Sequence, residues 1–415
     1  MKRPVSRKQA PSRSAWRWIT GLLALLSVAP GLPAAPTLDV KGVSALRSVA
    51  YYRFQRPLRS LELEDFRDDL ERMRGVGFNT VWIVVPWREL SPVALPEAEL
   101  APEVWQKLDA VLERLGAYGF FVVFPLGYFG RGWSPGGLPE ARLAEWVIDP
   151  AMWGAYEAHV LRLTRRYAAC ANVLWLFYGE SVIQRPSAFE GLAQAEASFR
   201  DYCRQANPDI AHWNARWHTV YPAIDDIGME EPGALRWEDH FRWLCDLMRT
   251  RFGTLARTLK RDVGIRGLVG FHDDAMITLD WAKGDTPVPA DNPYDVLSFV
   301  AYLDADTPIG ERMAGVQATL DRFRAQYPKV PMMIGESGVP TLVRDEATQA
   351  AYLEAIADFV RAHGLGLNVW MWQDFEGASR EQRSFGLLRV DGSAKPAVER
   401  LGAAFRAMDN GPKKD

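Results

Sequence analysis

Two glutamates, Glu180 and Glu336, stand where their carboxylates could act together on one substrate. Glu180 lies in the run Leu176–Ser181 and Glu336 in the run Met333–Gly338, and each follows a short apolar segment typical of a β-strand. A parallel barrel brings the ends of its strands to one cleft, so carboxylates 156 residues apart can meet there. One proton donor and one nucleophile are what retaining cleavage of a glycosidic bond requires. The alternative is that each Glu only caps the next helix or forms an ion pair at the rim.

The elements that must position these residues alternate between short apolar strands and amphipathic helices from about residue 46 onward. Leu61–Arg74 and Ala350–Ala362 each carry apolar residues at the spacing of one buried helix face. Eight strands with intervening helices predict an α/β fold, the (β/α)8 or TIM barrel. The expected strands are Arg47–Phe54, Asn79–Pro86, Phe120–Leu126, Val173–Tyr178, Gly267–Phe271, Val296–Tyr302, Met332–Gly335 and Leu367–Trp372.

A ninth apolar segment, Ile210–Trp217, is the weak point of this count. We assign it to a long insertion after strand 4, from about Asn207 to Glu238. If it were a strand, the later strands would be renumbered, but the strand ends that carry the two glutamates would not change. The expected organisation is a single barrel domain over residues 36–408 with a short tail at 409–415.

The N-terminal segment has the order of a secretory signal. The first 17 residues contain six Lys or Arg and no acid, Trp18–Val28 is mostly apolar, and Pro30–Pro36 consists of small residues and proline. This order predicts a signal peptide over residues 1–35 and a periplasmic or secreted protein. Because Trp18–Leu38 carries no charge, an uncleaved membrane anchor is the alternative, although its prolines and short apolar core favour cleavage.

Charge and cysteine content exclude several classes of function. Of the 49 Lys and Arg, 43 remain beyond the predicted signal against 52 Asp and Glu, so the mature chain is near −9. This acidic balance argues against a nucleic-acid partner. Three cysteines, Cys170, Cys203 and Cys245, allow at most one disulfide and give no metal signature. These counts predict no metal site. Together with the two glutamates, they lead us to expect a carbohydrate partner, no organic cofactor, and membrane contact only if the N-terminal segment stays uncleaved.

Several stretches, in order along the chain, resemble clan A of the glycoside hydrolases, the retaining enzymes with one catalytic Glu after strand 4 and another after strand 7. WNARWHTVYP and the long helix after it are similar to the equivalent part of family 42 β-galactosidases, with families 5 and 35 next. The stretches that carry the resemblance are GFNTVWIVVPW (Gly77–Trp87), NVLWLFYGES (Asn172–Ser181), DVLSFVAY (Asp295–Tyr302), VPMMIGESG (Val330–Gly338), and NVWMWQDFEG followed by FGLLRVDGSAKPA (Phe385–Ala397).

By this resemblance Glu180 would be the general acid/base and Glu336 the nucleophile. The two roles need different environments. Glu336 must stay ionised, which a hydrogen bond from Tyr302 or the charge of Arg53 would favour. Glu180 must keep its proton near neutral pH, which partial burial and the charge of Glu336 would favour.

Other residues at expected strand ends could bind the sugar. Trp372 or Trp370 is expected to form the floor of the −1 subsite, with Gln373 beside them, and the alternative for these tryptophans is barrel packing. His272, with the two aspartates that follow it, could bind hydroxyl groups; we expect no metal there because no second His or Cys is placed to join it. Tyr128, in a glycine-rich loop after strand 3, could line the cleft or belong to a surface loop.

Two positions depart from the clan pattern. The clan places Asn before the acid/base, where it binds the sugar 2-hydroxyl, and this chain has Gly179. The clan commonly has Arg on strand 2, where Trp82 stands here, so Arg53 would have to serve instead. Gly179 could open space beside carbon 2 for a different sugar, or it could mark an inactive site.

These patterns lead us to expect a retaining glycoside hydrolase that cleaves a β-linked oligo- or polysaccharide by double displacement. Two alternatives remain. One is a weakly catalytic or non-catalytic barrel that binds a polysaccharide during export, for which Gly179 is the main support. The other is a transglycosylase, which would use the same two glutamates but exclude water from the acceptor side.

Overall fold

The computed structural model describes residues 35–51, 61–83, 85, 102–126, 147–178, 192–229, 234–273, 292–376 and 379–409. The predicted signal or anchor lies outside these residues except for its last position, and the tail lies outside them except for its first. Glu180, Gly179, Arg53 and Tyr128 also lie outside the described residues. No helix within the described ranges is long and apolar enough to cross a membrane.

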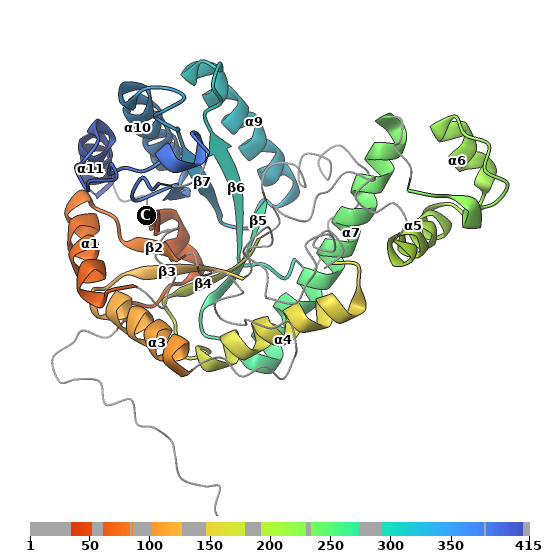
Figure 1. Cartoon of the computed structure of the whole chain (residues 1–415), viewed down its shortest axis with the longest axis horizontal. Coiled ribbons are helices and arrows are strands. Elements are labelled where there is room, and N and C mark those ends of the chain that lie inside the picture. The colour runs from red at the N-terminus through yellow and green to blue at the C-terminus, as the bar shows by residue number, and fades with distance from the viewer. Residues whose placement is uncertain are drawn as a thin grey trace, which may run out of the picture. The chain divides into compact units, whose positions relative to one another are not determined.

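Eight parallel strands close into a barrel in chain order, β1 to β8, which confirms the predicted TIM-barrel fold (Figure 1). Closure comes from the first and last strands, where Arg47 of β1 pairs with Leu367 of β8. The strands are β1 (Arg47–Tyr51), β2 (Thr80–Ile83), β3 (Phe121–Pro125), β4 (Val173–Tyr178), β5 (Leu268–Asp273), β6 (Val296–Tyr302), β7 (Met332–Gly338) and β8 (Gly366–Val369).

All eight strands were predicted, and their ends differ in two places that matter for the site. β7 continues to Gly338 instead of ending at Gly335, because its last residues pair with β6 as far as Tyr302. Glu336 is therefore inside the strand and not beyond it. β8 ends at Val369, short of the expected Trp372, although Trp370 and Trp372 still donate backbone hydrogen bonds to Ser337 of β7 and Ala50 of β1.

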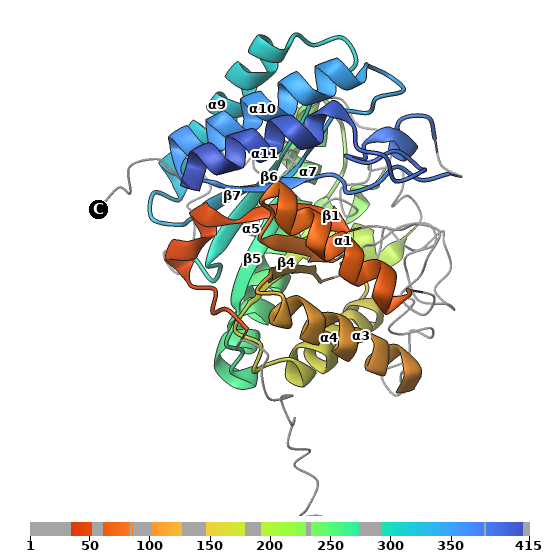
Figure 2. The same ribbon diagram turned by 90° about the vertical axis from the view of Figure 1, so that its left-hand side faces the viewer.

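Helices surround the strands, and Figure 1 shows α9, α10, α11, α1, α3 and α4 in an arc around the barrel. In the quarter-turn view of Figure 2, α10 and α11 run side by side, and these two helices are in contact. The helices are α1 (Leu63–Val76), α3 (Pro102–Ala117), α4 (Pro150–Arg166), α5 (Ala193–Ala206), α6 (Ile210–Trp217), α7 (Ala234–Thr258), α9 (Ile309–Gln326), α10 (Glu346–His363) and α11 (Pro396–Asp409), with short 3-10 or π turns at Val40–Ala45, Ile224–Asp226, Leu259–Val263 and Gln382–Ser384.

The segment Ile210–Trp217, the possible ninth strand, is the helix α6. Asp209 caps its N-terminus by accepting a hydrogen bond from the amide of Ala211. Trp213 and Trp217, four residues apart, are both buried, as expected for one face of a helix. The segment therefore adds no strand to the barrel, and its description as an insertion relative to other barrels stays a prediction.

Apolar side chains form two separate layers because successive residues of a strand point to opposite sides. Val49, on β1, packs in the outer layer between strands and helices. Its neighbour Ala50 packs in the inner layer inside the barrel, with Trp82 of β2 and Leu174 of β4. This alternation decides which strand residues can reach the barrel mouth.

Candidate active site

The carboxylate of Glu336 faces the barrel interior because β7 contains one extra residue. Met333 packs in the inner layer and Ile334 in the outer layer. Strict alternation would then turn Gly335 inward and Glu336 toward the helices. Instead the register with β6 shifts, so that Ile334 pairs with Phe299 and Glu336 pairs with Val300, the next residue. This bulge leaves Glu336 on the inner side of the barrel.

The extra residue has to be glycine. A Cβ atom on Gly335 would lie 1.8 Å from Ser298 Oγ and 2.4 Å from His272 Nδ1. Those two side chains are hydrogen-bonded to each other at 2.8 Å. From the other side, the buried Asn368 of β8 donates a hydrogen bond to the carbonyl of Gly335 at 2.8 Å. The strands on both sides of β7 therefore hold the backbone beneath the carboxylate.

Tyr302, at the end of β6, donates its hydroxyl to Glu336 Oε2 at 2.6 Å. This is the hydrogen bond expected from the sequence, and its length is typical of an O–H donor on a carboxylate. Glu336 is 5% exposed, so the bond is largely shielded from water. The arrangement is a buried carboxylate, with a dedicated donor, at the carboxyl end of a barrel strand.

Aromatic side chains pack in the same layer of the barrel as Tyr302. Trp370, Phe375 and Phe385 are nearly buried and pack in the inner layer, where Tyr302 joins them. The rings of Tyr302 and Phe385 have centroids 5.3 Å apart. The flat face of an indole such as Trp370 suits the apolar face of a sugar ring. Trp370 therefore remains the candidate for the floor of the subsite.

Trp372 does not belong to this group. Its indole is 2% exposed and packs in the outer layer, where Nε1 donates to Asp69 of α1 at 3.0 Å. Alternation along a strand would give residues 370 and 372 the same direction, but β8 ends at Val369. With no exposed ring face for a sugar, Trp372 has the packing role that was its alternative.

Two further expected sugar ligands are engaged within the protein. Gln373 Nε2 donates to the carbonyls of Arg389 and Val390 at 3.3 and 3.1 Å. His272 is fully buried, lies edge-on to Trp82 with centroids 5.5 Å apart, and supports the backbone at Gly335. Burial lowers the pKa of His272 to about 3, so its imidazole is neutral. In this structure His272 has no surface on which to bind a hydroxyl group.

The proposed partner of Glu336 is Glu180, which follows β4 in the sequence. β4 is described to Tyr178, which pairs with His272 of β5, and Glu180 lies two residues further along the chain, outside the described ranges. Arg53 and Tyr128 also fall outside them. The roles of these three residues, and the separation of the two carboxylates, stay predictions.

Sequence reasoning missed a buried polar group beside the site. Lys395 forms an ion pair with Asp374 at 2.8 Å, and the side-chain amide of Gln349 donates to the backbone carbonyl of Phe385. The signal was present in the run FGLLRVDGSAKPA, where Lys395 precedes an apolar helix. Asp69, the polar residue on the buried face of α1, was a second such signal.

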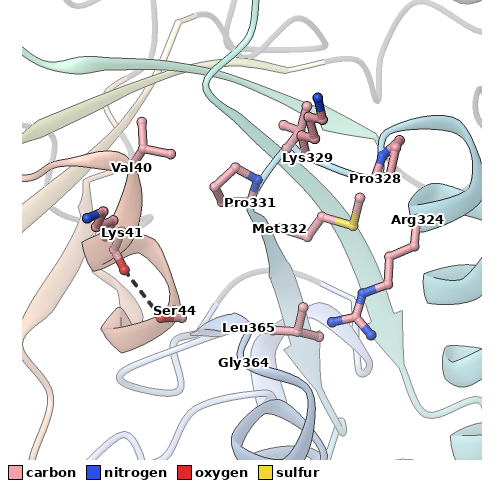
Figure 3. A pocket seen from close by; sticks show the side chains of 11 residues that line it. Val40, Lys41, Ser44, Arg324, Pro328, Lys329, Pro331, Met332, Gly364 and Leu365 are labelled. Atoms are coloured by element: carbon pink, nitrogen blue, oxygen red, sulfur yellow. Dashed lines mark hydrogen bonds between the residues drawn. The ribbon is translucent and has the colours of Figure 1, made fainter. Parts of the chain in front are cut away.

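The part of the chain that the structure describes contains no group of three His, Cys, Asp or Glu side chains placed to hold a metal ion. A cavity of about 420 Å³ lies at the opposite end of the barrel, next to the first residues of β7 (Figure 3). Its lining includes Lys41, Arg324, Lys329 and Met332. Because Glu336 lies toward the other end of the same strand, this cavity is separate from the candidate site.

No protein-family model and no curated protein sequence matches this chain. Solved structures do match its fold. A β-galactosidase from the psychrophilic Marinomonas ef1 has 15% identity and a TM-score of 0.62, covering 87% of this chain and 59% of its own. A cold-adapted β-galactosidase from Rahnella sp. R3 has 17% identity and a TM-score of 0.67, covering 91% and 57%.

A GH5_18 protein from Streptomyces cattleya, in complex with GlcNAc, has 16% identity and a TM-score of 0.54, covering 86% of this chain and 77% of its own. This chain thus spans less than two thirds of the two β-galactosidases. At these identities the likeness shows the barrel fold alone, because one barrel supports many chemistries.

Proposed function

We propose that the protein is a retaining glycoside hydrolase that cleaves a β-linked oligo- or polysaccharide, with Glu336 as nucleophile and Glu180 as acid/base. The observation that carries this proposal is the hydrogen bond from Tyr302 to the buried carboxylate of Glu336, at the carboxyl end of a barrel strand. Catalytic residues of such barrels lie at this end. The structural neighbours named as β-galactosidases and as an exo-β-1,4-mannosidase support a glycoside as substrate.

The nucleophile needs an ionised carboxylate that is shielded from water and held in one orientation. Burial alone disfavours the charged form of Glu336, and the hydroxyl of Tyr302 offsets this by donating to it. The same bond, made to Oε2, orients the carboxylate. Tyr302 thus supports both the charge and the direction of the nucleophile.

The reaction would proceed in two displacements. Glu336 attacks the anomeric carbon and forms a glycosyl ester while the bond to the leaving oxygen breaks. Glu180 gives that oxygen its proton. Glu180 then takes a proton from water, the water oxygen attacks the anomeric carbon, and the ester bond to Glu336 breaks. The proton balance closes because Glu180 loses and regains one proton in each cycle.

Gly179 supports a restriction on the substrate. By the resemblance to clan A, an Asn at this position would lie beside carbon 2 of the sugar, and Gly179 would leave that space open. We therefore propose a sugar that is substituted or differently configured at carbon 2. Gly179 also supports a second candidate function, a barrel that binds a polysaccharide without cleaving it.

Export to the periplasm or beyond is also part of the proposal, and it is supported by the basic, apolar and small-residue order of the N-terminal segment. Mass spectrometry of the protein recovered from periplasmic and membrane fractions tests it. A mature N-terminus near residue 35 in the periplasmic fraction is expected. A full-length chain in the membrane fraction would establish the anchor instead.

The deciding experiment for the activity is a screen of the purified protein against aryl glycosides and β-glycans. Glu336→Gln is expected to abolish turnover, whereas Glu354→Gln, which removes an exposed carboxylate of α10 paired with Arg400, should leave it unchanged. Retained anomeric configuration in the product, followed by NMR, is the expected stereochemistry. Turnover by Glu336→Gln equal to that of the unaltered protein would refute the assignment. Absence of turnover together with glycan binding by calorimetry would favour the binding protein.

A further inference from the structure

A short loop segment, Ser384–Gly386, lies against the end of β7 and touches the candidate site. Phe385 is 5% exposed, and a Cβ atom on Gly338 would lie 2.9 Å from its ring. Gly338 is the register partner of Tyr302, and the ring of Phe385 packs on that tyrosine. Phe385 is thus in contact with the residue that donates to Glu336.

Lys395, just before α11, fastens this segment. Its side chain is 1% exposed, and its ammonium group bonds Asp374 at 2.8 Å, Thr341 Oγ1 at 2.9 Å and the carbonyl of Ser384 at 3.2 Å. Asp374 in turn accepts a hydrogen bond from the amide of Gly386 at 2.7 Å. One buried ion pair therefore holds the backbone on both sides of Phe385.

Gln349, from α10, fastens the same segment from behind. It is fully buried, and its side-chain nitrogen lies 3.1 Å from the carbonyl of Phe385 and 3.3 Å from that of Gly386. The same nitrogen lies 3.1 Å from the carbonyl of Val339, which directly follows β7. Gln349 thus joins the loop segment to the strand that carries Glu336.

Stability alone gives a poor account of this arrangement. Burial raises the pKa of Asp374 and lowers that of Lys395, so for each group desolvation outweighs the favourable effect of its partner. Replacing a buried ion pair by apolar residues of similar volume is often neutral or stabilising. The ion pair instead fixes the conformation of the backbone around Phe385, because its hydrogen bonds hold the residues on both sides of it.

We propose that Lys395, Asp374 and Gln349 form a clamp that presses Phe385 against Tyr302 and thereby positions the hydroxyl group that serves Glu336. Phe385 and Lys395 are then positioning residues, which act on the sugar only through Tyr302. The catalytic consequence rests on the proposed glycosidase function, whereas the effect on Tyr302 does not.

Two pairs of variants test the clamp. Phe385→Leu removes the contact, and its control, Phe405→Leu, makes the same change at a fully buried phenylalanine of α11 that packs on Phe78. Lys395→Met breaks the clamp, and its control, Arg400→Met, breaks the exposed ion pair between α11 and Glu354 of α10. The controls separate a general loss of stability from a loss of positioning.

The kinetic result is a split between turnover and binding. Phe385→Leu and Lys395→Met are expected to lower kcat by about tenfold with KM within about threefold, whereas the two controls keep kcat within about twofold. Because Phe385 acts through Tyr302, adding Phe385→Leu to Tyr302→Phe should lower kcat by less than about twofold further. Losses that multiply in the double variant would overturn the proposal.

A second measurement needs no activity. In protein labelled with 3-fluorotyrosine, the ¹⁹F resonance of Tyr302, assigned through Tyr302→Phe, should shift in Phe385→Leu and Lys395→Met and stay in place in both controls. An unmoved resonance in the clamp variants would overturn the proposal. If the unaltered protein cleaves no glycan, the proposed function fails and this resonance alone decides whether the clamp positions Tyr302.

Discussion

The side chains of Trp370 and Trp372, two residues apart, lie on opposite sides of the barrel wall. Trp370 packs in the inner layer with Tyr302, and Trp372 packs in the outer layer with its indole nitrogen bonded to Asp69. Trp370 therefore packs inside the barrel, and Trp372 connects the barrel to α1. The same attachment includes Tyr51, whose hydroxyl donates to Asp69 at 2.9 Å.

The two tryptophans should respond to substitution in different ways. Trp372→Phe removes a donor from a buried carboxylate, so the free energy of unfolding should fall by about 1–3 kcal/mol with kcat/KM nearly unchanged. Trp370→Ala should lower kcat/KM by more than about tenfold through loss of the sugar-binding face. Chemical denaturation and steady-state kinetics of both variants check this. A loss of kcat/KM in Trp372→Phe with unchanged stability would instead indicate that Trp372 binds the sugar.

Removal of the nucleophile should change the chemistry as well as the rate. Glu336→Ala is expected to lose several orders of magnitude in turnover. Azide should restore cleavage of an activated aryl glycoside, because azide fits the space left by the carboxylate and attacks from the same face. The expected product is a glycosyl azide of inverted configuration, identified by NMR. A retained configuration would be inconsistent with Glu336 as nucleophile.

The assignment of Glu180 as acid/base can be tested by varying the leaving group of the substrate. Loss of the Glu180 carboxyl should slow substrates with poor leaving groups far more than activated aryl glycosides, because only the former need protonation. Kinetics of Glu180→Ala on a series of aryl glycosides tests this. In a crystal structure the carboxyl groups of Glu180 and Glu336 should be about 5–5.5 Å apart. Equal losses across the series would remove Glu180 from the mechanism.

The bulge in β7 should tolerate no side chain. Gly335→Ala places a methyl group against Ser298 and His272 and should destabilise the barrel by several kcal/mol, roughly the scale of core overpacking. Gly315→Ala in α9, where nothing lies within 4 Å of the new Cβ atom, should stabilise the protein by about 0.5–1 kcal/mol. Urea unfolding of the two variants measures the contrast. Equal stabilities would mean that the neighbours of Gly335 move aside freely.

The free energy of unfolding should fall as the pH drops below about 6.5, well above the pH at which the carboxylates titrate. Burial lowers the pKa values of His159, His240 and His272 to about 3. An unfolded histidine binds its proton near pH 6.5, so between that pH and about 3 the unfolded state holds more protons. Each histidine then costs about 1.4 kcal/mol per pH unit below 6.5. Unfolding curves between pH 7.5 and 5 test this, and His159→Gln should reduce the slope.

The fold was predictable because every barrel strand is a short apolar run between helices with one buried face. Val173–Tyr178 and Val296–Tyr302 were predicted to the residue. The ends of β7 and β8 were not, because they depend on pairing between strands far apart in sequence. The opposite directions of Trp370 and Trp372 were also not predictable, because simple alternation would turn both the same way.

The site was predictable to the extent that it follows strand ends. Tyr302 and Glu336 were expected together and are hydrogen-bonded. The clamp was not expected, because Asp374 and Lys395 are separated by a loop whose path the sequence pattern does not give. His272 was placed at a strand end correctly, but its complete burial, against Trp82 of β2 and Ser298 of β6, was not expected.

The pairing of β1 with β8 joins the first strand of the barrel to the last. A chain that is still being synthesised, or still being threaded through a translocation channel, has no closed barrel until Val369 has emerged. The clamp is completed later still, when Lys395 arrives. The order of the chain itself therefore delays assembly of the site until its last strand and Lys395 are available. If the protein is exported and cleaves sugars as proposed, a partly transported molecule would be inert in the compartment where it was made.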